Sequence, residues 1–352
     1  MNHSGPAKIE FGPGVLLLSS LLVSRPIAKV LVVALDNLGD TVMAAAVLAP
    51  LRRFLPGAAV GFWVKKYSAG ALAGARIDCV HAADPFWDSA PGRAKGAFRD
   101  FAKTLGEVYA VGYDLALVLN AEWRRALACR LAGIRRRVGF DSRQSRFLLT
   151  EALPPGGLEH QIDSHRRLLE HVLAQAVPES LCRPRLEFRE EDRRRGRDWV
   201  ARRGWTKNHV VLLHPFTGDP LKCWPLQRWG RLMVAIAKGH PGARFAVACG
   251  PGELASLERV LAPCHDLAAA VAPDALLTEV RGLLSLARAF VGGDSGLGHL
   301  AAAADVPALS LFGPTAPERY APRGRGKVVV IRQDPLRDLP VERVAAALQA
   351  LL

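Results

Sequence analysis

The hydrophobic residues of this chain fall into short continuous runs separated by longer segments with helical periodicity. The first run, residues 29–35, reads Lys-Val-Leu-Val-Val-Ala-Leu. Such a β-branched run without polar alternation is typical of a strand buried on both faces of a parallel sheet. By the same criterion we expect further strands at 60–64, 79–81, 114–119, 209–213, 244–248, 289–292 and 308–312.

Helical periodicity fills the intervals between these runs. We expect helices over residues 41–54, 122–132, 163–174, 190–203, 226–237, 297–304 and 341–352. Between 150 and 185 the pattern is less regular and rich in Pro, Gly and His, so we interpret this stretch, with the charged helix after it, as the crossover between two halves. The strand–helix alternation predicts an α/β fold with two Rossmann-like, doubly wound domains facing a central cleft.

The length of 352 residues also favours two domains over one core. We divide the chain into an irregular leader (1–27), an N-terminal acceptor-binding domain with the crossover (28–185) and a C-terminal nucleotide-sugar-binding domain (186–352), whose final helix can pack back on the N-terminal domain. The apolar run 15–23 is shorter than the ~20 residues that span a bilayer, and it lacks the basic flank of a signal peptide. We therefore expect a cytoplasmic protein that can visit a membrane surface.

The charge and the cysteines narrow the choice of partners. The formal net charge of +14 is consistent with nucleic acid, an anionic membrane or phosphorylated substrates as partners, although arginine-rich composition can also reflect a GC-rich genome. Nucleic acid is disfavoured, because the chain has no zinc-finger spacing and no basic stretch interleaved with aromatic residues. The six scattered cysteines form no C-x-x-C pair and indicate reduced thiols.

Candidate chemistry lies in the loops that follow predicted strands, where ligands bind in open α/β sheets. In the loop 36–40, Asp40 has two interpretations, as the cap of the following helix or as a general base at the cleft. In the loop 214–225, Lys222 precedes a Trp-Pro pair that opens a helix, which suits a phosphate-binding ammonium, and Thr217 adds a hydroxyl. An exposed surface lysine is the alternative for Lys222.

The third loop has the sequence Gly-Asp-Ser-Gly-Leu-Gly-His over residues 293–299. Glycines between a strand and a helix leave N–H groups accessible, and the helix dipole adds partial positive charge, so this turn can bind a diphosphate without a metal. His299 is placed to donate to a phosphate oxygen. The alternative is a tight turn with Ser295 as N-cap and His299 packed against it.

Other enzyme classes lack their central signatures. The Gly-Asp-Ser-Gly tetrapeptide matches the surroundings of a trypsin-like serine, but that motif belongs to an all-β scaffold, and Leu297 breaks the G-x-S-x-G elbow of α/β-hydrolases. No Walker A or G-x-G-x-x-G sequence follows a predicted strand.

Taken together, the three loops resemble glycosyltransferase family 9, the ADP-heptose:lipopolysaccharide heptosyltransferases. The resemblance is carried by residues 29–40, 214–225 and 293–303 and continues through 311–315, in the family's order. It implies a GT-B fold and an inverting, metal-independent enzyme without a cofactor. Such an enzyme moves heptose from ADP-heptose to a lipopolysaccharide core acceptor of the lipid A–Kdo type, at the cytoplasmic face of the inner membrane.

The resemblance also implies roles for individual residues. Asp40 matches the general base and Lys222 the phosphate-binding lysine. The residues implied in donor binding are Thr217, Lys222, Glu253, Asp294, Ser295, Gly296, Leu297 and His299. Acceptor-binding candidates are Asn37, Asn120 and Arg124, on the side where the chain departs from the family pattern. Arg124, Arg125, Arg135 and Arg136 are candidates for a face that meets anionic lipid.

Two alternatives remain open on the sequence. One is a related GT-B enzyme that uses another nucleotide sugar or a protein acceptor. The other is a non-catalytic protein that binds sugar nucleotides or nucleic acid, although the presence of both Asp40 and Lys222 speaks against it.

Overall fold

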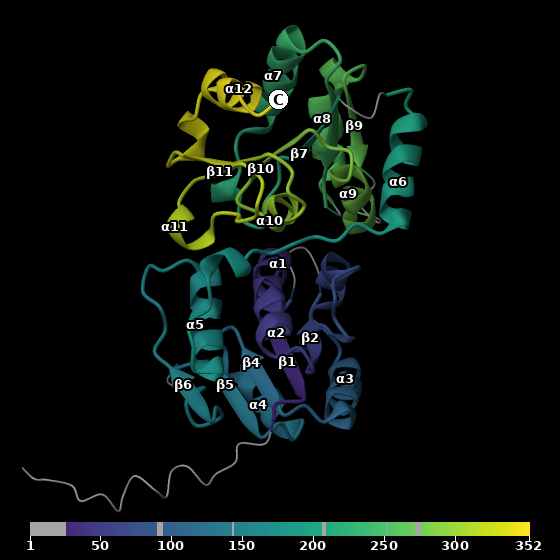
Figure 1. Cartoon of the computed structure of the whole chain (residues 1–352). Coiled ribbons are helices and arrows are strands. Elements are labelled where there is room, and N and C mark those ends of the chain that lie inside the picture. The colour runs from purple at the N-terminus through teal and green to yellow at the C-terminus, as the bar shows by residue number, and fades with distance from the viewer. Residues whose placement is uncertain (1–25, 90–93, 143, 206–208, 251, 272–275) are drawn as a thin grey trace, which may run out of the picture.

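The chain forms two α/β halves stacked one above the other (Figure 1). The computed structural model describes residues 26–352 except 90–93, 143, 206–208, 251 and 272–275. Residues 1–25, including the apolar run 15–23 of the expected leader, lie outside the described residues. Within the described part of the chain, no helix is long and apolar enough to cross a membrane.

Strands and helices alternate in both halves. The first half contains β1 (Lys29–Ala34), α1 (Leu38–Ala44), α2 (Leu48–Phe54), β2 (Ala59–Val64), β3 (Cys79–Ala82), α3 (Phe98–Val111), β4 (Leu115–Val118), α4 (Trp123–Leu131), β5 (Arg136–Phe140), β6 (Glu151–Leu153) and α5 (Gln161–Leu173). The second half contains α6 (Glu190–Ala201), β7 (Val210–His214), α7 (Leu226–Gly239), β8 (Arg244–Ala248), α8 (Leu254–Leu261), β9 (Ala268–Val271), α9 (Leu276–Leu284), β10 (Ala289–Gly293), α10 (Gly296–Ala303), β11 (Ala308–Phe312), α11 (Pro317–Tyr320), β12 (Val328–Arg332) and α12 (Val341–Gln349).

Each half is built around a six-stranded sheet whose neighbouring strands all pair in parallel. The strand orders are β3-β2-β1-β4-β5-β6 and β12-β11-β10-β7-β8-β9. Both are the doubly wound order 3-2-1-4-5-6, in which the winding direction reverses between the first and fourth strands. The predicted fold class is therefore confirmed. Ligands are expected at these reversal points, beyond the carboxyl ends of β1 and β4 and of β7 and β10.

All eight predicted strands are present, but four further strands were not predicted. They are β5, β6, β9 and β12. One of them, β12, has the sequence Val-Val-Val-Ile-Arg, which meets the criterion used for the other strands and was overlooked. The strand β5 begins with two arginines, β6 has three residues and β9 is mostly alanine, so none of these three gives the apolar run by which the other strands were recognised. These strands form because the twisted sheet continues and provides a partner, which is a tertiary effect that local propensity does not contain.

The helix predicted over 41–54 is interrupted in the structure. It begins earlier, at Leu38, and residues 45–47 form a 3₁₀ turn before α2 starts at Leu48. Pro50 explains the break, because proline has no N–H to donate to the carbonyl four residues earlier and its ring clashes with that carbonyl.

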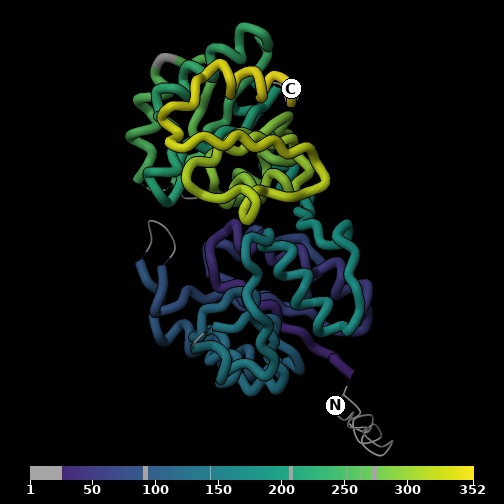
Figure 2. Tube along the Cα trace, turned by 90° about the vertical axis from the view of Figure 1, so that its left-hand side faces the viewer, coloured from purple at the N-terminus to yellow at the C-terminus, as the bar shows by residue number. Residues whose placement is uncertain are grey.

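The last helix requires a correction. We expected that it can pack back on the N-terminal domain, but Val344 and Leu348 of α12 join the core of the second half together with Trp229 and Met233 of α7. Figure 2 shows the yellow C-terminal segment over the upper half. The apolar stripe of α12 is thus buried in the core of the second half, to which the helix belongs.

The two halves are joined by specific polar contacts as well as by packing. The ring nitrogen Nε2 of His160 lies 2.8 Å from the carbonyl oxygen of Ala321. The guanidinium of Arg323 donates to Asp163 at 2.8 Å. On the other side of the molecule, Arg281 Nη2 donates to the carbonyl oxygen of Ala73 at 2.9 Å. These contacts fix the edges of the space between the carboxyl ends of the two sheets.

Candidate active site

A cavity of about 980 Å³ lies between the two halves and is lined from both. The first half contributes the N-terminal turn of α1, and the second contributes the loops that follow β7 and β10. Its volume is at the upper end of the range of ligand-binding pockets. The cavity adjoins the reversal points of both sheets, where doubly wound folds bind ligands.

The N-termini of α1 and α10 meet at this cavity. A Cβ atom on Gly296 would lie 2.7 Å from Leu38 Cβ and 2.9 Å from the backbone nitrogen of Gly39. The two helices therefore approach closely only because residue 296 has no side chain. Two helix N-termini at one cavity provide free N–H groups and partial positive charge, which favour an anionic ligand.

In the second half, the reversal point is bridged by a hydrogen bond between side chains. His214 ends β7, and its Nδ1 lies 2.9 Å from the hydroxyl oxygen of Ser295, which follows β10. Burial lowers the pKa of His214 to about 4, so this imidazole is neutral at neutral pH. Ser295 occupies the N-cap position of α10, but its side chain does not cap the helix.

The Ser295–His214 pair does not complete a hydrolase triad. Among the described residues, no carboxylate bonds to His214, whereas a triad needs a third group to orient the base. The pair instead fixes the hydroxyl of Ser295 at the mouth of the turn. His214 was not among the predicted site residues, although its position directly after a predicted strand was a usable signal.

Lys222 and Asp294 form an ion pair on the wall of the same cavity. Lys222 Nζ lies 2.9 Å from Asp294 Oδ2, and both residues line the cavity. Lys222 belongs to a short 3₁₀ turn, 220–222, that follows the loop after β7. Thr217 Oγ1 of this loop donates to the carbonyl oxygen of Asp219 at 2.6 Å, so its hydroxyl proton is already engaged. The predicted ammonium is therefore placed beside the glycine-rich turn.

His299 is buried at the contact between the halves. Burial lowers its pKa to about 4, and a Cβ on Gly39 would lie 3.0 Å from its ring. The structure therefore shows His299 packed against α1 of the other half, whereas the alternative weighed for this residue had it packed against its own turn. As a neutral imidazole it can still donate one N–H, but in this state it carries no positive charge to a phosphate.

Glu253 lies at another part of the cavity wall. Its carboxylate accepts a hydrogen bond from the backbone N–H of Gly250, and burial raises its pKa. Both residues line the cavity together with Leu276 and Leu277. A half-buried carboxylate in a cavity that leucine side chains also line is suited to a partly polar group.

Asp40 is both a helix cap and a cavity residue, so its two interpretations are compatible. Its carboxylate accepts from the backbone N–H of Asn37 at 3.2 Å and completes a capping box at the start of α1. The side chain also lines the cavity. Burial, and next the charge of Asp36, raise the pKa of Asp40 to about 7. A carboxyl group with such a pKa is well matched to proton transfer near neutral pH.

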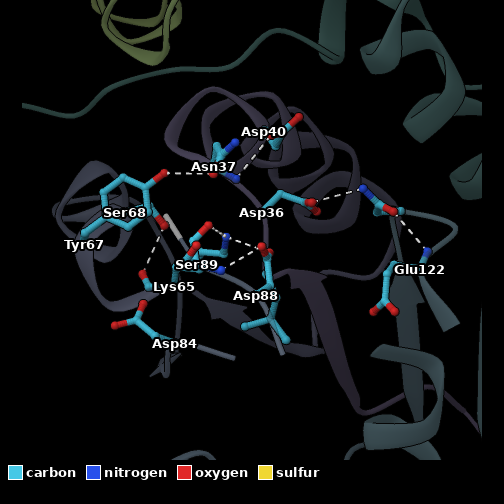
Figure 3. A network of polar contacts seen from close by, with 12 residues as sticks. Asp36, Asn37, Asp40, Lys65, Tyr67, Ser68, Asp84, Asp88, Ser89 and Glu122 are labelled. Atoms are coloured by element: carbon cyan, nitrogen blue, oxygen red, sulfur yellow. Dashed lines mark hydrogen bonds and ion pairs between the residues drawn. The ribbon is translucent and has the colours of Figure 1, made fainter. Parts of the chain in front are cut away.

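A network of charged groups lies next to Asp40 at the reversal point of the first sheet. Asp36, directly after β1, accepts two hydrogen bonds from the buried guanidinium of Arg125, one of them 2.7 Å long. Asn120, directly after β4, donates to Asp36 at 3.0 Å. Figure 3 shows Asp36 close to Asp40. Because Asp36 is tied to both β4 and α4, its charge is held at a fixed place beside Asp40.

A second ion pair, between a buried lysine and a partly exposed aspartate, belongs to the same network. Lys65, directly after β2, is 1% exposed and donates to Asp88 at 2.8 Å. Figure 3 shows Lys65, Asp88 and Ser89 grouped below Asp36 in this view. Sequence reasoning missed Asp36, Arg125 and Lys65 as parts of the site. Asp36 and Lys65 each directly follow a predicted strand, whereas nothing local in the sequence marks Arg125.

The structure separates the three acceptor-binding candidates. Asn37 is exposed and lines the cavity. The side-chain oxygen of Asn120 accepts from the N–H of Glu122 at 3.0 Å, and Arg124 pairs with Glu122 at 2.9 Å, so both side chains are held at the start of α4. Arg125 cannot belong to an exposed face for anionic lipid, because it is 4% exposed and bonded to Asp36. That part of the sequence-based hypothesis was wrong.

The described residues contain no group of three or more His, Cys, Asp or Glu side chains arranged to hold a metal ion. The polar groups at the cavity include the ammonium of Lys222, the carboxyl groups of Asp40 and Asp294, the hydroxyl of Ser295 and two neutral imidazoles. This arrangement can hold an anionic leaving group on the side of the second half and accept a proton on the side of the first.

Comparison with known proteins agrees with this geometry. Residues 99–340 match a family model described as glycosyltransferase family 9 (heptosyltransferase). The chain is 30% identical over 324 residues to lipopolysaccharide heptosyltransferase 1 of Pseudomonas aeruginosa, covering 85% of this chain and 82% of that protein. It is 26% identical to lipooligosaccharide heptosyltransferase 2 of Haemophilus ducreyi, covering 86% and 88%.

Solved structures share the fold at lower sequence identity. A glycosyltransferase family 9 protein from Veillonella parvula superposes with a TM-score of 0.79 at 18% identity, covering 92% of this chain and 97% of that one. An Escherichia coli heptosyltransferase solved with ADP gives a TM-score of 0.74 at 18% identity, covering 92% and 100%.

Proposed function

The chain belongs to glycosyltransferase family 9, and from that premise we propose that it transfers heptose from ADP-heptose to a lipopolysaccharide core acceptor. It is a glycosyltransferase with the GT-B fold. The observation that carries the proposal is the cavity between the halves, in which Asp40 from one half faces the Lys222–Asp294 pair and Ser295 from the other. The heptosyltransferase names of the relatives support the choice of donor and acceptor.

In the proposed reaction, the acceptor hydroxyl oxygen attacks the anomeric carbon of the donor while the bond from that carbon to the diphosphate oxygen breaks. The electron pair of the broken bond leaves with ADP, and the configuration at the anomeric carbon inverts. Asp40 takes the proton of the attacking hydroxyl. A base with a pKa near 7 accepts this proton more readily than an ordinary aspartate with a pKa near 4.

The departing diphosphate gains negative charge, which the second half is built to stabilise. One wall of the cavity is formed by Lys222, the hydroxyl of Ser295 and the N–H groups at the start of α10. Lys222 is balanced by Asp294 in the structure, and a bound diphosphate would compete for its ammonium. Preorganised donors at the leaving group lower the barrier without reorganisation during the reaction.

We assign the first half to the acceptor and the second half to the nucleotide. Asn37, at the cavity, is the first-half residue best placed to meet the acceptor, with Tyr67 beside it. Glu253, with the leucines near it, is placed to meet the nucleoside. We further propose that the enzyme needs no metal or other cofactor, is cytoplasmic, and works at the inner membrane, where a lipid-anchored acceptor is found.

A panel of nucleotide sugars tests the proposal directly. ADP-heptose should raise the thermal midpoint of the protein and be converted to ADP with a core acceptor, and EDTA should leave the rate unchanged. The Asp40→Asn variant is the control that binds the donor without turning it over. Stabilisation by UDP- or GDP-sugars instead of ADP-sugars would point to another donor, and loss of activity in EDTA would contradict metal independence.

A further inference from the structure

The edge of the first half carries an exposed pair of aromatic rings. Phe98, the first residue of α3, is 67% exposed, and Phe86, which follows β3, is 39% exposed. Their ring centroids lie 5.1 Å apart with the planes at 71°. The stripe of α3 that faces the core continues through Phe101, which is buried, so Phe98 lies where that stripe leaves the protein. Two large apolar side chains that contact each other at the surface indicate a site where the protein binds another molecule or a membrane.

In the part of the chain that the structure describes, three cations without an ion-pair partner lie around this pair of rings. Lys95, Arg99 and Lys103 are all exposed, and among the described residues none of them takes part in an ion pair. The neighbouring carboxylates are Asp84, Asp88 and Asp100, with the exposed Glu107 one turn beyond Lys103 on α3. Asp84 and Asp100 are bonded to Lys66, through its backbone N–H at 3.0 Å and its ammonium at 2.7 Å respectively, and Asp88 is bonded to Lys65 at 2.8 Å. The three outward cations are therefore available to an anionic surface.

The position of this patch relative to the cavity is also informative. Because α3 follows the edge strand β3, its first turn lies at the carboxyl edge of the sheet, where Lys66 contacts Asp100. The next residue, Tyr67, lines the cavity. Figure 1 shows α3 at the outer edge of the lower half. A planar surface that touches the patch would thus lie beside the acceptor side of the cavity.

We propose that the patch formed by Phe86, Lys95, Phe98, Arg99 and Lys103 docks on an anionic phospholipid surface. Aromatic rings at the level of the headgroups, flanked by Lys and Arg, are the combination by which peripheral elements lie in a membrane interface. The anionic headgroups meet the cations while the two rings enter the boundary of the acyl chains. The patch deepens the proposed function, since it rests on an acceptor that is itself anchored in that membrane.

Vesicle binding tests the assignment. The full chain is sedimented with vesicles of phosphatidylethanolamine and phosphatidylglycerol, and with vesicles of phosphatidylcholine alone. We expect binding to the anionic vesicles to fall roughly tenfold or more in Phe98→Ser, and roughly 20- to 30-fold in Arg99→Gln/Lys103→Gln, because each cation near the surface contributes about fivefold. Both sites are exposed, and equal thermal midpoints will show that the variants are folded.

Two matched controls separate the patch from general charge attraction. Arg231→Gln/Lys238→Gln removes the same charge from α7, and Phe147→Ser removes a ring that is 82% exposed elsewhere in the first half. Neither should change binding more than about twofold. The proposal is overturned if the control variants weaken vesicle binding as much as the patch variants do, or if Phe98→Ser binds vesicles like the wild type. It is also overturned if the chain binds an acidic protein more tightly than it binds anionic vesicles. Titration with ADP is scored separately, because failure of the donor site would leave vesicle binding unchanged.

Discussion

The backbone nitrogen of Gly39 lies only 2.9 Å from the place that a Cβ atom on Gly296 would occupy. The first turns of α1 and α10 thus touch across the two halves through residues without side chains. The proposed general base and the proposed diphosphate-binding turn lie on one cavity at this contact.

Gly296→Ala should therefore impair the site without unfolding the protein. The added methyl group meets backbone, which cannot rotate away, so the halves must shift at a cost of about 1–3 kcal/mol. We expect ADP affinity and turnover both to fall tenfold or more. Gly298→Ala in the same helix is the control, because the nearest atom to its Cβ is 3.4 Å away. An equal loss in both variants would show that any methyl group in the first turn of α10 disturbs the site, and that the contact with Gly39 is not responsible.

Asp40→Asn should abolish most turnover while it retains donor binding. Loss of a general base typically costs roughly 10²–10⁴ in rate, and the amide preserves the shape of the capping residue. The rate is measured as ADP release with acceptor present, and binding as ADP affinity by calorimetry. A turnover within threefold of the wild type would exclude Asp40 as the base.

The raised pKa of Asp40 predicts opposite effects of pH on activity and stability. The carboxylate must be unprotonated to act as a base, so turnover should rise with pH through about 7. Because the folded state holds this proton more tightly than the unfolded chain, whose value is near 3.8, stability is lost as the pH rises from about 4 to about 7. Asp40→Asn should then be more stable than the wild type at pH 8, with the difference shrinking toward pH 4. Unfolding by denaturant at several pH values measures this directly.

Asp36→Asn should shift the same profile and also weaken the fold. Removal of the neighbouring charge lowers the pKa of Asp40, so the acid limb of the rate profile should move to lower pH. It also leaves the buried guanidinium of Arg125 without its carboxylate, which should cost about 3–5 kcal/mol of unfolding free energy. Glu179→Gln is the control, because it breaks an exposed pair with Arg183 and should cost under about 1 kcal/mol. An unmoved acid limb would show that Asp36 does not tune Asp40.

Lys222→Ala should weaken ADP binding by roughly 10- to 100-fold, the usual range for losing one charge-assisted hydrogen bond. It also leaves Asp294, which is 10% exposed, as an unpaired negative group near the diphosphate. Lys238→Ala on α7 removes an exposed lysine from the same half and should leave affinity unchanged. The ADP affinity of both variants is measured by calorimetric titration. If the two variants bind ADP with equal affinity, Lys222 does not contact the phosphates.

Much of the fold could be predicted because its central strands carry their own signal. Continuous apolar runs such as 29–35 form strands that are buried on both faces of the sheet. The loops that follow these strands bring polar residues to the carboxyl edge of the sheet. Strands at the sheet margins, such as β5 and β6, could not be predicted, because their residues extend a sheet that other segments build.

The candidate site shows the same division. Asp40, Lys222 and the turn at 293–299 lie in the segments that follow strands, so their position made them candidates and the family resemblance supplied their roles, and the structure places them around one cavity. The partners of these residues could not be read locally. His214 bonds to Ser295 and Arg125 to Asp36 across separations of 81 and 89 residues, and only the completed sheets bring them together. Burial explains why His299 is neutral, and burial is not encoded in its neighbours along the chain.

Arg281 has a mechanical consequence at the far edge of the molecule. Its guanidinium bonds within the second half to Asp192 and to the carbonyl oxygen of Glu187, but it reaches the first half only at the carbonyl oxygen of Ala73. If the halves move apart there, this hydrogen bond is exchanged for water and the apolar packing of Ala71, which belongs to a cluster shared with the second half, is lost as well, while the buried ion pair stays intact. Arg281 therefore belongs mechanically to the second half, and a separation of the halves at this edge would leave its ion pair with Asp192 undisturbed.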